Sequence, residues 1–242
     1  MNVVVVIAHQ DDEMRCLGTL LRYRDEGHRV AIVCVTNGNR GLPFTDESTL
    51  ADVAAVRDRE MRSVCAVIGA DYHCLDRGDG AAVADLELRN QLVGVLRTLE
   101  ADVVFTHWTS DYNPDHVATA RAVIDAALFT SLGSFAPGTA PLRRPPGIFH
   151  MSPGDGYGYE ATHFVPLTEA ISTEKSRLIR LHVSQMGVLK HMRGRDYADD
   201  VAEEDRRNGA RMLVDAAEAF RPCLSERRIP WPDSLPGSEV ER

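Results

Sequence analysis

Lysine is almost absent from this chain, since only Lys175 and Lys190 occur among its 27 basic residues. We attribute the preference for arginine to genome composition rather than to chemistry. Aspartate and glutamate number 36, which gives a net charge of −9. The sequence therefore has no basic stripe of the kind that a general nucleic-acid surface requires, and we expect no nucleic-acid partner.

Cysteine motifs, targeting signals and long apolar runs are also missing. The five cysteines never follow a C-x-x-C spacing, and most lie within apolar patterns, where buried free thiols are usual. The first residues lack a cationic start, and no apolar run is long enough to span a membrane. These absences predict a cytoplasmic protein without membrane contact. The 242 residues, 44% of them hydrophobic, are sufficient for one large globular domain.

Short apolar runs alternate with amphipathic segments along the first half of the chain. We expect strands over residues 2–7, 30–35, 72–75 and 102–106. Between and after them we expect helices from Met14 to Gly27 and over 51–69, 88–99 and 117–128. This alternation predicts an α/β class protein, with a Rossmann-like, mostly parallel sheet and helices on both faces.

The alternation stops at residues 131–160, where eleven residues are glycine or proline. Loops this long within a compact domain are usually functional, so we expect a single Gly/Pro-rich loop that caps the active site.

Regular structure is expected to resume at residues 163–165 and to end with two helices. The first helix is expected from about Glu169 to Lys190, and the second from roughly Glu203 to Phe220. In the second helix we expect an inward face made of Met212, Leu213, Ala216 and Phe220. A single domain would then span residues 1–220, followed by a Pro-rich tail over 221–242.

The most informative stretch, Ala8-His9-Gln10-Asp11-Asp12-Glu13, directly follows the first expected strand. It places an imidazole and three carboxyl groups in a strand-to-helix turn. Ligands of open α/β sheets bind at this edge of the sheet. An aspartate at such a position often only caps the helix. Helix capping does not require a nearby histidine, so we favour a binding site.

A second segment dense in histidine and aspartate follows the strand at 102–106. It reads His107-Trp108-Thr109-Ser110-Asp111-Tyr112-Asn113-Pro114-Asp115-His116. In a parallel sheet it opens on the same edge as His9 and Asp12. Two histidines and one aspartate with an open fourth position are typical of a catalytic zinc, and Fe(II) accepts the same ligands.

His9-x-Asp11-Asp12-Glu13 together with Pro114-Asp115-His116 resembles the LmbE-like, or PIG-L, zinc-dependent N-deacetylases. These enzymes include de-N-acetylases of glucosaminyl-phosphatidylinositol, of mycothiol and bacillithiol precursors and of some glycopeptide antibiotics. The resemblance covers residues 1 to about 190. It includes further segments: Val35–Gly38, Arg57 with Glu60, Leu75–Gly80, Thr162–Phe164 and His182–Gln185.

The resemblance implies a role for each residue that matches the family pattern. His9, Asp12 and His116 become the zinc ligands. Asp11 becomes the general base that activates the zinc-bound water. Asp115 would orient the imidazole of a ligand histidine. Other histidines are not expected to be ligands, although three of them are candidates for positions next to the ligands: His107, His163 and His182.

Arg57 and Asp79 match positions that contact the substrate in the sugar-processing relatives. For Arg57, an ion pair with Glu60 is an equally good interpretation. The chain departs from the family pattern at two positions. Gln10 replaces the usual proline, and Asn113 replaces a histidine that is expected to stabilise the oxyanion and help to protonate the leaving amine. Asparagine can donate a hydrogen bond but cannot carry a proton.

Taken together, these features predict a metal-dependent N-deacetylase, a hydrolase of linear amide C–N bonds. Its substrate would be a small N-acylated molecule, such as an N-acetyl amino sugar, selected by the loops at 38–50 and 131–160. The alternative is a zinc-loaded but catalytically weak or silent relative with a binding or structural role. Asn113 keeps this alternative open, whereas the intact Asp11 counts against it. A nucleotide-binding Rossmann protein is poorly supported, because no G-x-G-x-x-G follows the first strand.

Overall fold

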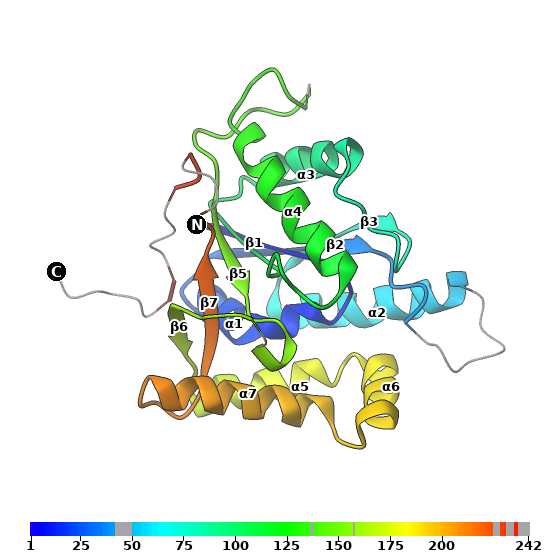
Figure 1. Ribbon diagram of the computed structural model, residues 1–242, viewed down its shortest axis with the longest axis vertical. Coiled ribbons are helices and arrows are strands. Elements are labelled where there is room, and N and C mark those ends of the chain that lie inside the picture. Colours follow the sequence, from blue (N-terminus) through cyan, green and yellow to red (C-terminus); the bar gives the residue numbers. More distant parts are fainter. Residues whose placement is uncertain (42–49, 137, 157, 225–227, 231–234, 237–242) are drawn as a thin grey trace.

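A seven-stranded sheet forms the centre of the protein, with helices on both faces (Figure 1). The computed structural model describes residues 1–41, 50–136, 138–156, 158–224, 228–230 and 235–236. The strands are β1 (Asn2–Ile7), β2 (Arg29–Thr36), β3 (Asp71–Arg77), β4 (Val103–Thr106), β5 (Gly147–Met151), β6 (His163–Pro166) and β7 (Ala217–Pro222). The helices are α1 (Leu17–Asp25), α2 (Leu50–Ile68), α3 (Leu86–Thr98), α4 (Pro114–Phe129), α5 (Glu169–Ile179), α6 (Val183–Arg193) and α7 (Tyr197–Arg211), with short 3₁₀ turns η1 (Asp12–Arg15) and η2 (Gly154–Gly156).

The strand order is β3-β2-β1-β4-β5-β7-β6, and β7 alone runs antiparallel to its neighbours. The chain therefore moves outward from β1 in one direction to β3 and then returns to place β4 on the other side of β1. This reversal creates a switch point between β1 and β4, where ligands of open α/β sheets bind. The predicted α/β class and mostly parallel sheet are confirmed.

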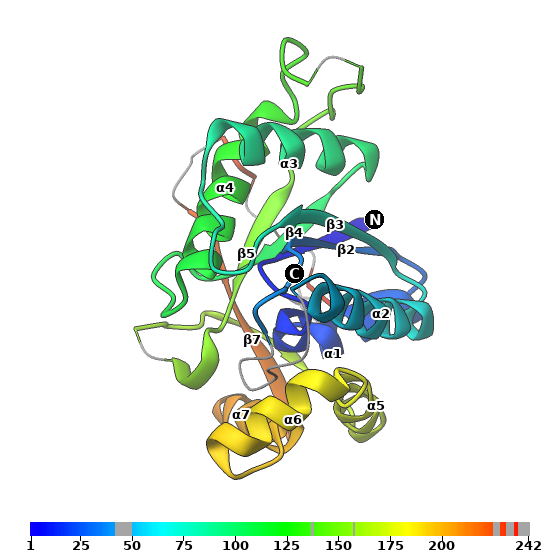
Figure 2. The same cartoon turned by 90° about the vertical axis from the view of Figure 1, so that its right-hand side faces the viewer.

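Both faces of the sheet are covered, so β1 is an uninterrupted apolar run. Val3, Val5 and Ile7 join the core cluster that contains α1 and α2. Val4 and Val6 face the other cluster, formed with α3 and α4. Helices α5, α6 and α7 form a further layer beyond α1 (Figure 2). Among the described helices, none has the length and apolar character needed to cross a membrane.

The segment 131–160 is not one loop, which corrects the prediction. β5 lies within it, pairs in parallel with β4 and is completely buried. The strand was missed in the sequence because it has only five residues and is flanked by prolines and glycines. The part before β5 connects the end of α4 to the start of β5, at the sheet edge opposite the switch point. Of the described residues in this segment, Ser152–Gly154 line a cleft that also contains His9, Asp12 and His116.

The helix expected over 169–190 is two helices, α5 and α6, separated by a bend at residues 180–182. The bend places the His182 ring against Glu13, with Nε2 2.8 Å from Oε1. Both side chains are completely buried. Beyond the bend, Glu60 accepts hydrogen bonds from the backbone N–H and the hydroxyl of Ser184, in the first turn of α6. Tertiary contacts of this kind are invisible to helical periodicity.

The last predicted helix, 203–220, is also wrong, because α7 ends at Arg211 and the chain continues as strand β7. Met212 and Leu213 are 47% and 94% exposed rather than inward. The chain folds back so closely that a Cβ on Gly209 would lie 2.7 Å from the backbone of Ala216. Phe220 is buried as expected, but it lies on β7. β7 ends two residues beyond the expected domain boundary at 220.

Lys175 is a buried cation that joins the outer helices to the sheet. Its Nζ lies 2.6 Å from Asp205 on α7 and 2.7 Å from Glu218 on β7. Glu218 also accepts hydrogen bonds from the backbone N–H groups of Gly18 and Thr19 at the start of α1. Burial lowers the pKa of Lys175, but the two carboxylates outweigh this effect and raise it above its usual value. The amine is therefore charged in the folded protein.

We expect Lys175→Met to lower the free energy of unfolding by about 3–5 kcal/mol, because it leaves two buried carboxylates without their cation. Lys190→Met is a matched control, since Lys190 is the other lysine of the chain and is exposed. The control should change stability by less than about 0.5 kcal/mol. Chemical denaturation measures both variants. Equal midpoints for the two variants would contradict the role of Lys175.

Candidate metal centre

The turn after β1 has an unusual backbone conformation at Asp11, and within this turn the side chain of Asp12 points back to His9. Asp11 adopts φ 142° and ψ −17°, a region that residues with a side chain rarely occupy and that is often associated with functional sites. Asp12 Oδ2 accepts a hydrogen bond from the backbone N–H of His9 at 2.7 Å. Neither aspartate caps η1 through its side chain, because Asp12 points back to His9 and Asp11 makes no capping bond. The capping interpretation is therefore wrong.

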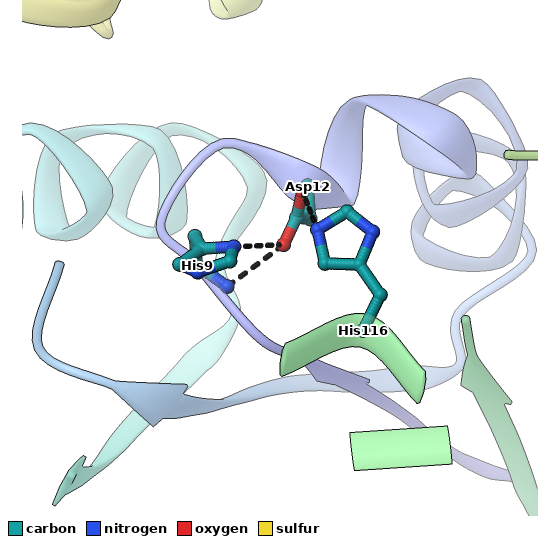
Figure 3. Close-up of side chains that lie close together, drawn as sticks. All are labelled: His9, Asp12 and His116. Carbon is teal, nitrogen blue, oxygen red and sulfur yellow. Dashed lines mark hydrogen bonds and ion pairs between the residues drawn. The ribbon is translucent and has the colours of Figure 1, made fainter. Parts of the chain in front are cut away.

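Asp12 lies between two imidazoles that come from opposite sides of the switch point (Figure 3). His9 Nδ1 is 3.3 Å from Asp12 Oδ2, and His116 Nε2 is 3.3 Å from Asp12 Oδ1. Two ligands at 2.0–2.1 Å from one tetrahedral zinc would lie about 3.4 Å apart. The spacing of these atoms therefore fits a shared metal ion.

The second nitrogen of each imidazole is occupied by a carboxylate. His9 Nε2 lies 3.2 Å from Asp115 Oδ2 and 3.3 Å from Asp79 Oδ1. His116 Nδ1 lies 3.1 Å from Asp111 Oδ2. Histidines that bind metals almost always present their other N–H to a carboxylate, a carbonyl or water. This arrangement leaves His9 Nδ1 and His116 Nε2 free to bind a metal beside Asp12.

His107, Asp111 and His116 form an overlapping set of potential ligands. However, His107 Nε2 already accepts a hydrogen bond from the backbone N–H of Ala8 at 2.8 Å. Burial and the neighbouring charge of His116 lower the pKa of His107 to about 4, so that its ring is neutral. His107 stacks on His116, with ring centroids 3.9 Å apart. These contacts indicate that His107 supports the ring of His116 and is not itself a metal ligand.

A further set, His9 with Asp79 and Asp115, uses the opposite nitrogen of His9. Both oxygens of Asp115 accept backbone N–H bonds, from Gly80 at 2.7 Å and from Ala82 at 3.1 Å. Asp115 is buried, and both of its carboxylate oxygens are already bonded to the loop that contains Gly80 and Ala82. Asp115 contacts His9 Nε2, and its role in orienting a ligand imidazole stays a prediction.

Carboxylates surround the two imidazoles and set their charge. Burial lowers the pKa of His9, but hydrogen bonds to Asp115, Asp12 and Asp79 outweigh it and raise the pKa well above the usual value. The same balance raises the pKa of His116 to about 9, mainly through Asp12. A divalent cation would replace these protons and supply the same positive charge. The donor set therefore fits a divalent metal.

Arg57 pairs with Asp11 and not with Glu60, which corrects one of the two interpretations of this residue. Its Nη2 lies 2.9 Å from Asp11 Oδ1 and also donates to the carbonyl of Gln10. Burial raises the pKa of Asp11, and Arg57 opposes the shift. The Arg57 side chain is only 4% exposed. A Cβ at Gly38 would lie 2.8 Å from Arg57 Cδ, so this glycine leaves the room that the guanidinium occupies.

Asn113 directly precedes α4 and caps its N-terminus. Its Oδ1 accepts a hydrogen bond from the backbone N–H of Asp115 at 2.9 Å, as expected of a helix N-cap. Its Nδ2 makes no hydrogen bond to any residue that the structure describes. Since Asn113 lines the cleft, this amide is a free donor near the candidate ligands.

These side chains line a cleft of about 220 Å³ at the switch point. Of the predicted residues, His9, Asp11, Asp12, Arg57, Asp79, Asn113 and His116 line it, and Asp115 lies behind His9. Sequence analysis did not assign Asp111, Arg15 or Tyr197, which also line it. Asp111 lies in the same loop as His116, and that position was the only signal for it.

Known proteins resemble this chain both in sequence and in fold. A profile of the family described as "PIG-L: GlcNAc-PI de-N-acetylase" matches residues 4–127, just over half of the chain. The chain belongs to this family. The match includes every residue of the candidate ligand set and the carboxylates around it: Asp11, Asp79, Asp111 and Asp115. The predicted family resemblance is confirmed.

Individual relatives of this PIG-L family chain have different activities. The chain is 28% identical over 151 residues to the 4-oxalmesaconate hydratase of Pseudomonas putida, a match that covers 60% of this chain and 58% of the hydratase. The diacetylchitobiose deacetylase of Pyrococcus horikoshii has a TM-score of 0.79 at 23% identity, with coverage of 92% of this chain and 84% of that one. A conserved protein of Thermus thermophilus gives 0.78 at 27% identity, with coverage of 97% and 100%.

We expect His9→Ala, Asp12→Ala and His116→Ala each to lose most of one bound divalent metal per chain, because two remaining ligands rarely hold such an ion. His107→Ala is the control, since it removes a neighbouring histidine but none of these three ligands. Elemental analysis of the purified variants measures the metal. Full occupancy in His9→Ala together with loss in His107→Ala would instead assign the set of His107, Asp111 and His116.

Proposed function

We propose that this protein is a zinc-dependent amidohydrolase that removes an N-acyl group, most simply acetyl, from an amino sugar or a similar small amide. The observation that carries the proposal is that two adjacent aspartates in one cleft have different surroundings. Asp12 lies between His9 Nδ1 and His116 Nε2, whereas the adjacent Asp11 contacts neither imidazole and is held by Arg57. One aspartate is thus available as a ligand and the other as a base.

Zinc, or Fe(II), would be held by His9, Asp12 and His116. When bound, such an ion lowers the pKa of a coordinated water to about 7 and polarises the amide carbonyl. Asp111 and Asp115 hold the ligand imidazoles from behind, through contacts of 3.1 and 3.2 Å. These contacts support the ligand assignment, because they leave the required nitrogen of each ring free.

Asp11 is the base in this proposal. Its burial raises its pKa, which makes the carboxylate a stronger proton acceptor than an exposed aspartate. Arg57 opposes this rise in pKa and holds the carboxylate through the contact at Oδ1. After accepting a proton from the attacking water, Asp11 can return it to the departing amine.

Asn113 supplies a hydrogen-bond donor and no proton. Its Oδ1 is committed to the N-terminus of α4, so the amide Nδ2 is the group left for the developing oxyanion. One well-placed donor of this kind typically contributes ~3 kcal/mol to the transition state. Proton delivery to the amine then rests on Asp11 alone.

Hydration of a carbon–carbon double bond is a second candidate function. The 28% identity to a 4-oxalmesaconate hydratase supports it, over a match that covers 58% of that enzyme. Addition of water to a double bond releases no amine, so the histidine that Asn113 replaces is not needed for protonating one; the proton that the water gives up to a base such as Asp11 is added to carbon instead. Two assays on the zinc-loaded protein separate the candidates: amine release from N-acetyl amino sugars and consumption of 4-oxalmesaconate. Consumption of 4-oxalmesaconate without amine release would favour the hydratase.

Asp11→Asn should retain the metal and the fold but lower turnover by roughly 10²–10⁴-fold, because the base is removed. Asparagine keeps an oxygen that can accept the hydrogen bond from Arg57. Single-turnover assays and elemental analysis of the same sample measure the two properties. Wild-type turnover in this variant would transfer the base role to another carboxylate, with Glu13 and Asp115 the next candidates.

Asn113→His should raise turnover on a good substrate and add a basic limb to the pH–rate profile, because a histidine can deliver a proton to the amine. The substitution also removes a helix cap, at a cost of about 0.5–2 kcal/mol of stability. Asn113→Asp is the matched control, since it keeps the cap but offers no amide donor, and it should be slower than wild type.

The prediction for Asn113 also tests whether the protein is catalytic. If Asn113→His stays at background on every amide and on 4-oxalmesaconate while zinc remains bound, the enzyme proposal fails. The protein would then be a zinc-binding relative with a binding or structural role.

A further inference from the structure

A second cavity, of about 380 Å³, adjoins the candidate metal cleft. Arg15, Gly154, Arg193 and Tyr197 line both cavities and form their common wall. Helix α7 provides most of the remaining lining, and Arg195, in the loop between α6 and α7, provides the rest. These four residues separate the two cavities, so the second cavity lies directly beside the cleft that holds the candidate ligand set.

The carboxylates of the second cavity are already paired with arginines. Glu204 lies 2.6 Å from Arg15, which also donates to the hydroxyl of Tyr197. Asp200 lies 3.0 Å from Arg195. The remaining carboxylate in the lining, Glu203, lies 2.6 Å from Arg206, which is outside the cavity. No carboxylate of the described lining is left to neutralise a further arginine.

Two arginines of the lining, Arg193 and Arg207, form no ion pair with the residues that the structure describes. Both are exposed. Arg193 lies over the ring of Tyr197, with its guanidinium carbon 5.0 Å from the ring centroid. The ring restrains the guanidinium without consuming its hydrogen-bond donors. Neither guanidinium is held by an ion pair to a described residue, so both can bind a ligand.

We propose that the second cavity is the distal part of the substrate site and that Arg193 and Arg207 bind an anionic group of the substrate there. Guanidinium groups form paired hydrogen bonds with carboxylates and phosphates, so the substrate belongs to the small acidic amides or acids that bear one of these groups. This inference rests on the proposed function for the position of the reacting end. It holds for either candidate reaction, because the distal cavity does not take part in the chemistry.

Binding to the zinc-loaded Asp11→Asn protein tests the proposal without any turnover. The probes are N-acetylglucosamine, its 6-phosphate and N-acetylmuramic acid, which share a sugar and differ in charge; glutarate and glutaramide form a second acid–neutral pair. Calorimetry should show tighter binding of the acidic members. Comparison of the phosphate with the carboxylate probe identifies the preferred anion.

Arg193→Ala and Arg207→Ala, made in the same protein, should each weaken binding of the preferred acid by about 10- to 100-fold, the usual contribution of a hydrogen bond between charged groups. Binding of the neutral partner should change by less than about 2-fold, and zinc content should not change. Arg177→Ala removes one exposed positive charge on α5 and is the control for net charge. It should leave both affinities unaltered.

Two results would overturn the distal anion site: no preference for the acidic member in either pair, or a preference that both substitutions leave intact. Equal losses in the Arg177→Ala control would likewise assign the preference to net charge. The proposed hydrolase fails on a different readout, the release of amine by the zinc-loaded wild-type protein. The two failures are therefore distinguishable.

Discussion

The position of Asp12 between two imidazoles is the contact on which the candidate site depends. Four groups converge on this carboxylate: the backbone N–H of His9, its Nδ1, His116 Nε2 and, at 3.4 Å, His107 Nε2. The parallel pairing of β1 with β4 brings the two halves of the site to one edge of the sheet. His9 follows β1 directly, and His116 lies in the first turn of the helix after β4. Any shift in this register would separate the imidazoles.

Carboxylates outside the ligand set then determine what each ligand can do. Asp115 and Asp79 contact His9 Nε2, and Asp111 contacts His116 Nδ1. Each contact fixes which nitrogen of the ring is available. The same carboxylates raise the pKa values of both histidines. A site with this much negative charge around two imidazoles is suited to a divalent cation.

The sequence predicted the parts of the fold and site that depend on local pattern. β1 and β2 are continuous apolar runs, and the His-Asp segments after β1 and β4 needed only the rule that parallel strands end at one edge. β5 escaped prediction because five buried residues between prolines and glycines have no periodicity. β7 escaped because Met212, Leu213, Ala216 and Phe220 recur at the spacing of one helix face, whereas the close approach of Gly209 to Ala216 shows that the chain reverses between them.

The partners of charged side chains were the least predictable feature, because each is chosen by tertiary packing. Arg57 has Glu60 one helical turn away, yet it contacts Asp11, and Glu60 instead caps α6. Asp111 is one of several carboxylates near His116, and only the structure shows that it is the one in contact.

The pairing of charged side chains also determines how charge is distributed between the cleft at the switch point and the second cavity. At the switch point, carboxylates outnumber the available cations, which favours a metal ion. Beyond Tyr197 the balance reverses, because each carboxylate of the second cavity has its own arginine while Arg193 and Arg207 have none among the described residues. A substrate that carries an anion at one end and a reactive carbonyl or double bond at the other would meet a complementary charge at both ends. In this proposal, two charge patterns on separate elements would orient such a molecule, one in the strand-end turns and the other on α7 and the end of α6.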